Sequence, residues 1–158
     1  MRFLVDGYNV TMADDATRRL PKAEQRLALV RRLATRGGDL LGRGAVTVVF
    51  DGDPDVSAPA AACTVDVRFA KGESADDVIV RLAAAERGEV VLVSSDRHLT
   101  ERMLAVAAGR ASARSASALF EEARPARRRR GTPRDTGIPT GGNRITEELK
   151  KVWLTDEE

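Results

Sequence analysis

The hydrophobic residues of this 158-residue chain fall into short continuous runs rather than alternating with polar ones. Four runs are clear and one is weaker: FLVD (3–6), AVTVVFD (45–51), CTVDVRF (63–69), EVVLVSSD (89–96) and RASARS (110–115). Continuous apolar runs of this length are typical of strands that are covered on both faces, as in parallel sheets. The pattern therefore predicts five strands in a buried sheet.

Helical patterns occupy most of the intervals between these runs. They cover residues 20–38, 74–88, 97–109 and 115–124. The first places Leu27, Val30 and Leu33 on one side and is expected to end at Gly37, while the second begins after Ser74 as an N-cap. Strands that alternate with helices predict an α/β fold of Rossmann-like type, with a mostly parallel central sheet and helices on both faces.

Two parts of the chain depart from this alternation. GDPDVSAPAAA, between the second and third predicted strands, is too short and too rich in proline for a helix, so a plain loop or a hairpin-like excursion is expected. After Arg124 the pattern gives way to RPARRRRGTPRDTGIPTGGN, and ITEELKKVWLTDEE follows as a short amphipathic segment. We therefore expect an α/β domain at 1–124, a basic flexible linker at 125–144 and a short C-terminal helix at 145–158.

The composition is that of a globular protein, with 42% hydrophobic and 32% charged residues. No apolar run approaches the roughly 18 residues of a membrane helix, and the amino terminus lacks the apolar region of a signal peptide. These features predict a cytoplasmic protein without a membrane partner. One cysteine excludes an intramolecular disulfide, and one histidine, His98, excludes a catalytic histidine pair.

The charge is unevenly distributed along the chain. Residues 1–122 carry 17 Lys and Arg against 18 Asp and Glu, whereas residues 123–158 carry 9 against 6. Six arginines and no acid lie between Ala123 and Arg134. A basic tail on a nearly neutral body points to an anionic polymer as a partner.

Acidic and amide side chains recur where the predicted strands end. They are Asp6 and Asn9 after the first strand, Asp51 after the second, Glu73, Asp76 and Asp77 after the third, and Asp96, preceded by Ser95, after the fourth. In an open parallel sheet, ligands bind beyond the carboxyl ends of the strands, at the switch in strand order. With the order 3-2-1-4-5, the first and fourth strands would be neighbours, and Asp6 and Asp96 would face each other.

Such a cluster of acids calls for a cation. Two carboxylates about 5 Å apart repel each other by roughly 3 kcal/mol at an effective dielectric constant near 20. Oxygen ligands without histidine or thiolate favour a hard ion, so Mg²⁺ or Mn²⁺ is the expected cofactor. The alternative is that each acid only caps a helix or stabilises a turn.

The motifs LVDGYNV, VVFDG, GESADDVIVRLA and VLVSSDRHLT, followed by GRASARSASALFEEAR, resemble in this order the PIN-like nuclease superfamily. Within it, they are similar to the YacP-like NYN-domain proteins. The resemblance covers roughly residues 1–124 and extends more distantly to the 5′-nuclease domain of bacterial DNA polymerase I. It implies a metal-dependent ribonuclease on a Rossmann-like sheet. It also implies endonucleolytic cleavage of single-stranded RNA, with mRNA and the ribosome as expected partners.

The resemblance assigns roles to individual residues. Asp6, Asp76 and Asp96 match the acidic positions of the family and are the expected catalytic and metal-binding residues, with Asp77 as an outer metal ligand. The expected supporting residues are Asn9, Asp51, Glu73, Ser74 and Ser95, and the expected phosphate contacts are Lys71, Arg97, Arg127, Arg128, Arg129 and Arg130. Polymerase-type relatives carry a further acid after the SD motif, whereas Arg97 and His98 follow Asp96 here. The number of metal ions therefore stays open.

Two other functions fit parts of the sequence. FDGDPD resembles the nucleophile motif of HAD-type phosphatases, although in that family the nucleophile belongs to the first strand, which here carries DGYN. A non-catalytic module that binds RNA or the ribosome is the second alternative. It is disfavoured because a site that has lost its activity usually loses at least one acid. The sequence does not determine the oligomeric state.

Overall fold

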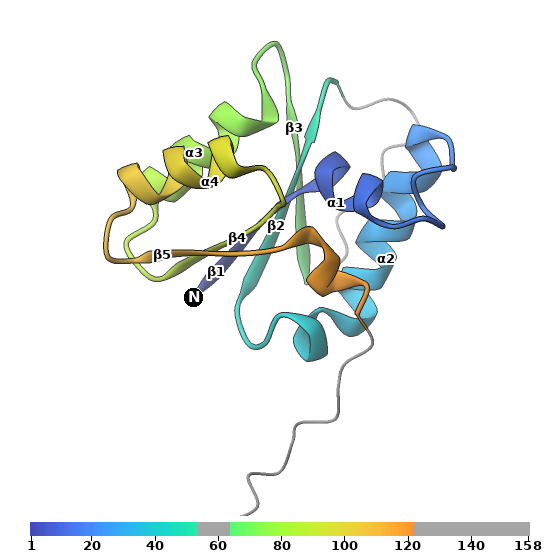
Figure 1. Ribbon diagram of the computed structural model, residues 1–158, viewed down its shortest axis with the longest axis horizontal. Coiled ribbons are helices and arrows are strands. Elements are labelled where there is room, and N and C mark those ends of the chain that lie inside the picture. The colour runs from blue at the N-terminus through green and yellow to red at the C-terminus, as the bar shows by residue number, and fades with distance from the viewer. Residues whose placement is uncertain (54–63, 122–158) are drawn as a thin grey trace, which may run out of the picture. The chain divides into compact units, whose positions relative to one another are not determined.

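Five strands form one parallel sheet in residues 1–53 and 64–121, the part of the chain that the computed structural model describes (Figure 1). They are β1 (Arg2–Asp6), β2 (Ala45–Asp51), β3 (Val65–Ala70), β4 (Val90–Val93) and β5 (Ala111–Arg114). The strand order is β3-β2-β1-β4-β5, and every pairing is parallel. The predicted fold class and order are confirmed, and β1 occupies the centre of the sheet.

Four α-helices and one 3₁₀ turn connect the described strands. They are α1 (Gly7–Ala13), α2 (Lys22–Leu40), α3 (Ala75–Ala85), α4 (Arg97–Val106) and the 3₁₀ helix η1 (Ala116–Leu119). The helix α1 was not expected from the sequence. The prediction that the first long helix ends at Gly37 was wrong, because α2 continues through Gly37 and Gly38 to Leu40. Of the segment expected to form the last helix (115–124), the described part up to residue 121 forms the short η1.

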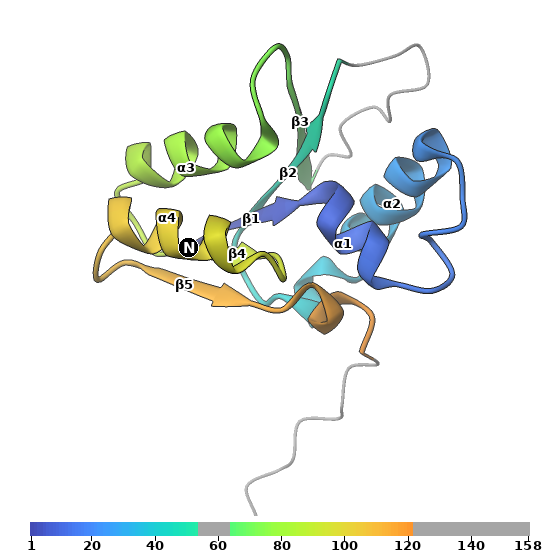
Figure 2. The ribbon, with the colours of Figure 1, turned by 45° about the horizontal axis from the view of Figure 1, so that its top comes forward.

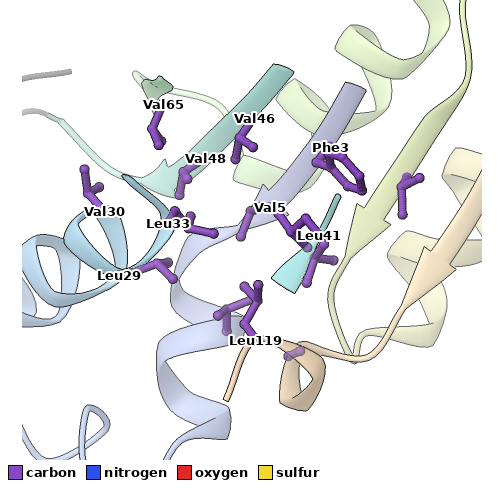
Figure 3. Close-up of a cluster of buried hydrophobic side chains, with 14 of the residues drawn as sticks. Phe3, Val5, Leu29, Val30, Leu33, Leu41, Val46, Val48, Val65 and Leu119 are labelled. Carbon is purple, nitrogen blue, oxygen red and sulfur yellow. The ribbon is translucent and has the colours of Figure 1, made fainter. Parts of the chain in front are cut away.

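The sheet is covered on both faces, as the continuous apolar runs predicted. Successive side chains of a strand point to opposite faces. Phe3 of β1 belongs to a buried cluster with Leu33 of α2 and Leu119 of η1 (Figure 3). The adjacent Leu4 lies in a second buried cluster with Ile79 of α3 and residues of α4. Figure 2 shows α1 and α2 on one side of the sheet and α3 and α4 on the other.

The connection between β2 and β3 is not a hairpin between antiparallel strands. Val46 pairs with Val65, and the two strands continue in parallel to Asp51 and Ala70. The connecting residues 54–63 lie outside the described residues, as do the predicted linker and C-terminal helix. The division of the chain at residues 124 and 144 therefore stays a prediction. No helix within residues 1–53 and 64–121 is long and apolar enough to span a bilayer.

The tight junction between β1 and α1 requires a glycine. Gly7 is the first residue of α1, and a Cβ atom built on it would lie 2.3 Å from two ring carbons of Phe50 and 2.9 Å from the Val49 carbonyl oxygen. The backbone φ of Gly7 is not positive. The absence of a side chain at Gly7 thus provides the space in which β2 packs closely against the start of α1.

Replacing Gly7 with alanine is expected to destabilise the protein by about 2 kcal/mol or more, because a methyl group would be forced into the Phe50 ring and the β2 backbone. Gly38→Ala is the matched control, since a Cβ there meets nothing within 4 Å inside α2. The control should be neutral or stabilising by about 0.5–1 kcal/mol. Urea denaturation measures both, and equal effects of the two substitutions would contradict this role of Gly7.

Candidate functional site

The acids after β1 and β4 are also the N-caps of the helices that follow. The first N–H groups of a helix have no partner within it, and an aspartate in front of them can accept their hydrogen bonds. Asp6 Oδ1 accepts a hydrogen bond from the backbone N–H of Asn9 (3.4 Å), and Asp96 Oδ1 accepts one from that of Leu99 (3.0 Å). The capping role considered as an alternative is thus present. It does not exclude a second role.

Asp51 and Asp76 meet at the N-terminus of α3. Asp51 Oδ1, at the end of β2, accepts a hydrogen bond from the backbone N–H of Ala75 (2.8 Å), the first residue of α3. This contact fixes the position of the next residue, Asp76, at the same edge of the sheet. Among the described residues, no side chain or backbone group donates a hydrogen bond to the half-buried Asp76 carboxylate.

Asp6 is the buried member of the group, with 8% of its surface exposed. Its Oδ2 accepts a hydrogen bond from the Ser94 hydroxyl (3.1 Å). The pKa of Asp6 is raised to about 6, chiefly by burial; the hydrogen bonds from Asn9 and Ser94 lower it, and the nearby carboxylates of Asp76 and Asp51 contribute to the rise. A carboxylate held in this way gains from any cation that can reach it.

The electrostatic coupling extends to the fourth acid. Burial raises the pKa of Asp76, and the charges of Asp96, Asp51 and Asp77 act in the same direction, while Arg102 opposes them. Asp6, Asp51, Asp76 and Asp96 therefore share one region of negative potential. We refer to these four residues as the acidic edge.

Two of the acids predicted from the third motif are tied to other partners. Asp77 accepts hydrogen bonds from Arg102 (2.5 Å) and the Ser74 hydroxyl (2.8 Å), and these contacts lower its pKa. Glu73 forms a bidentate ion pair with Arg81, whose two Nη atoms lie 2.6 and 2.8 Å from the carboxylate oxygens. Both carboxylates are therefore bonded to arginines and do not belong to the acidic edge. Asp77, the expected outer metal ligand, is bonded to Arg102.

The Asn9 side chain connects helix α1 to the loop between β4 and α4. Its Oδ1 accepts a hydrogen bond from the backbone N–H of Ser95 (2.8 Å), and the Ser95 hydroxyl in turn accepts one from the backbone N–H of Ala116 (3.2 Å). We expected Asn9 to orient a carboxylate or a phosphate oxygen. Its side chain instead joins α1 to the loop that carries Asp96. Ser74 caps α3 through the backbone N–H of Asp77 (3.1 Å), as expected.

Two of the predicted phosphate contacts, Lys71 and Arg97, lie at the surface. Lys71 is exposed in the turn after β3. Arg97 begins α4, has a side chain that is 92% exposed and lies 4.0 Å from Glu101. His98 is exposed as well. Arg127, Arg128, Arg129 and Arg130 lie outside the described residues.

Ser94 is the site residue that sequence reasoning missed. Val5 pairs with Val93, so the register places Ser94 beside Asp6, with Asp96 two residues further on. The signal was the position of Ser94 at the end of β4, one residue after the last apolar position. Recognising this signal requires knowledge of the register between β1 and β4, and the hydrophobic pattern alone does not determine that register.

The acidic edge matches a hard divalent cation in the chemistry of its donors, because all of them are carboxylate oxygens. Within residues 1–53 and 64–121, however, no three His, Cys, Asp or Glu side chains are gathered closely enough to share one metal ion. A divalent cation held by one or two carboxylates, with water in its remaining positions, would not need three such side chains. Asp6 and Asp76 are the acids best placed for this, because the pKa of each is raised by burial and by neighbouring carboxylates.

Comparisons with known proteins show the family of the chain. The family model described as the YacP-like NYN domain matches residues 3–153. The chain belongs to the YacP-like NYN family. This family is of the nuclease type, so the assignment supports a nuclease-like function related to RNA. The match extends well beyond residue 124, into the segments predicted as linker and helix.

Two crystal structures of a family member are similar to this chain. Rae1 (YacP) from Bacillus subtilis is 26% identical with a TM-score of 0.62, over 96% of this chain and 81% of that one. A tryptophan-to-leucine mutant of the same protein is 25% identical with a TM-score of 0.61, over 100% of this chain and 86% of that one. No curated protein sequence matches the chain.

The raised pKa of Asp6 predicts a pH-dependent cost to folding. The pKa of Asp6 is 3.8 at its ordinary value and about 6 in the folded protein. The folded state therefore binds the proton more tightly, and stability falls as the pH rises from about 4 through 6. In EDTA, Asp6→Asn should be more stable than the wild type by about 1–3 kcal/mol at pH 7.5, and the difference should vanish near pH 4.

Urea denaturation at the two pH values measures this difference. Asp39→Asn is the control, because Asp39 is an exposed aspartate near the end of α2, and it should change stability little at either pH. An Asp6→Asn variant that is less stable than the wild type at pH 7.5 would contradict the conclusion that the buried, ionised Asp6 carboxylate lowers the stability of the fold.

Proposed function

We propose that this protein is a metal-dependent ribonuclease that cleaves single-stranded RNA internally, with Mg²⁺ or Mn²⁺ bound at the acidic edge. The observation that carries the proposal is the burial of Asp6 beside Asp76 and Asp51, which leaves negative charge uncompensated at the end of the central strand. Membership of a nuclease-type family supports the same conclusion. The ribosome and mRNA are the partners we propose, and the cytoplasm is the compartment.

The bound cation would lower the pKa of a coordinated water and neutralise charge that develops on the phosphate during in-line attack. The chain's own residues hold the acids in place for this. The Ser94 hydroxyl and the Asn9 backbone fix the two oxygens of Asp6. Asp51 anchors the N-terminus of α3 and so presents Asp76. The Asn9 side chain holds the loop that carries Asp96 against α1.

Cleavage of a 5′-labelled, unstructured RNA in Mn²⁺ tests this function. Wild-type protein should produce internal fragments that disappear in EDTA. Asp96→Asn should lower kcat/KM by 100-fold or more, on the scale of a lost electrostatic contact to the reaction centre. Asp39→Asn should behave as the wild type. RNA binding that persists in EDTA and in Asp96→Asn, without any cleavage, would favour the non-catalytic module instead.

The structure separates the two adjacent acids of α3. Asp76→Asn should reduce cleavage by 100-fold or more, because its carboxylate belongs to the acidic edge. Asp77→Asn should reduce cleavage by less than about fivefold, because this exposed side chain bonds to Arg102 and Ser74, and exposed ion pairs contribute little. Steady-state kinetics with both variants, each checked for folding by circular dichroism, provide the test. A larger loss in Asp77→Asn than in Asp76→Asn would overturn this assignment.

A further inference from the structure

A hollow of about 360 Å³ opens beside the acidic edge, between the start of α4 and the end of β5. The loop Ser94–Arg97 forms one wall, Thr100 and Glu101 of α4 continue it, and Ala113–Ser115 form the opposite wall. Asp96 belongs both to this hollow and to the acidic edge, where its charge acts on Asp76. A molecule in the hollow would therefore lie next to the site of cleavage.

Hydroxyl groups supply part of the polar surface of the hollow, whose lining is otherwise largely apolar. The hydroxyl oxygens of Ser95 and Ser115 lie 3.3 Å apart, and those of Ser115 and Ser117 lie 3.0 Å apart. Each hydroxyl offers one donor and two acceptor positions. The Ser115 hydroxyl bonds to the hydroxyls of Ser95 and Ser117 and to the backbone N–H of Ser117, which uses all three of its positions. The Ser95 hydroxyl bonds to Ser115 and to the backbone N–H of Ala116, so one position of this exposed side chain is left for a ligand.

The charges around the hollow do not suit a free phosphate. Asp96 and Glu101 supply two negative charges, and the exposed Arg97 lies beside Glu101 at the rim. Arg114 contributes to the wall, but its guanidinium group is directed away, to the Phe3 ring (5.7 Å) and the Leu41 carbonyl oxygen (3.2 Å). With Arg114 directed away, the two carboxylates outnumber the one remaining cation of the lining, Arg97, and this balance favours a neutral polar ligand.

We infer that this hollow binds the base and ribose of one nucleotide of the RNA substrate, beside the phosphate that is cleaved at the acidic edge. The inference rests on the proposed ribonuclease function and identifies a substrate subsite for it. A nucleoside is neutral, rich in donors and acceptors, and of a size that such a hollow can hold. The phosphate attached to it would lie on the Asp96 side, where the cation is proposed to bind.

Filling the hollow tests the inference. Ala113 is exposed and lines it, so Ala113→Leu should occupy the space without disturbing the core. Ser112→Leu is the matched control, because the neighbouring residue of β5 is also exposed but does not line the hollow. Ala113→Leu should raise KM for single-stranded RNA about tenfold or more, with a smaller change in kcat, as expected for loss of one nucleoside contact. Ser112→Leu should stay within about twofold of the wild type.

A binding measurement in EDTA separates this inference from the proposed catalysis. Adenosine should shift the NMR signals of the Ser95, Ala113 and Ser115 amides in wild-type protein but not in Ala113→Leu. Inorganic phosphate should not shift them. Adenosine binding without any RNA cleavage would support the nucleoside site and contradict the nuclease. Metal-dependent cleavage with equal KM in the two leucine variants, or shifts caused by phosphate and not by adenosine, would overturn the inference.

Discussion

The buried carboxylate of Asp6 is the constraint on which the rest of the site depends. It stands at the end of the central strand, where burial and two neighbouring acids raise its pKa to about 6. Capping α1 does not by itself require a charge, because an uncharged serine, threonine or asparagine can serve as N-cap, and an ionised group is costly to bury without an opposite charge. The surrounding structure holds Asp6 with one hydroxyl and one backbone N–H, and within the described residues no basic side chain pairs with it. The fold thus maintains a carboxylate that is ready for an external cation.

The parallel sheet makes this arrangement possible. All strand pairings are parallel, so the carboxyl ends of β1, β2 and β4 meet at one edge. Helices begin directly after β1 and β4, and their free N–H groups need acceptors at the same edge. Aspartate satisfies that need and adds negative charge at the same time. An aspartate at these positions therefore caps a helix and also contributes its charge to the acidic edge.

The sequence predicted the sheet and its order because the relevant signals are local or topological. Continuous apolar runs identify strands that are buried on both faces, and the strand order placed Asp6 and Asp96 on neighbouring strands. The sequence could not predict features that depend on side-chain contacts between helices, strands and loops. Two hydrogen bonds are examples: Ala75 donates one to Asp51, and Arg102 donates one to Asp77. Each joins residues that are more than 20 positions apart in the sequence. The helix α1 was also missed, because its seven residues are too few to show a helical period.

The four acids differ in how their charge is compensated, and this difference bears on where a cation would bind. Asp51 and Asp96 each accept a hydrogen bond of 3.0 Å or less from the first turn of a helix, whose partial positive charge stabilises a carboxylate. Asp6 receives longer bonds of 3.1 and 3.4 Å, and the described residues give the Asp76 carboxylate none. In the proposed function, a divalent ion would therefore gain most between Asp6 and Asp76, with Asp51 and Asp96 contributing through water or through the field. All four acids lie at helix N-termini, since Asp6 caps α1 and Asp76 belongs to the first turn of α3. The difference between the two pairs therefore comes from their hydrogen bonds, which leave the need for a cation on Asp6 and Asp76.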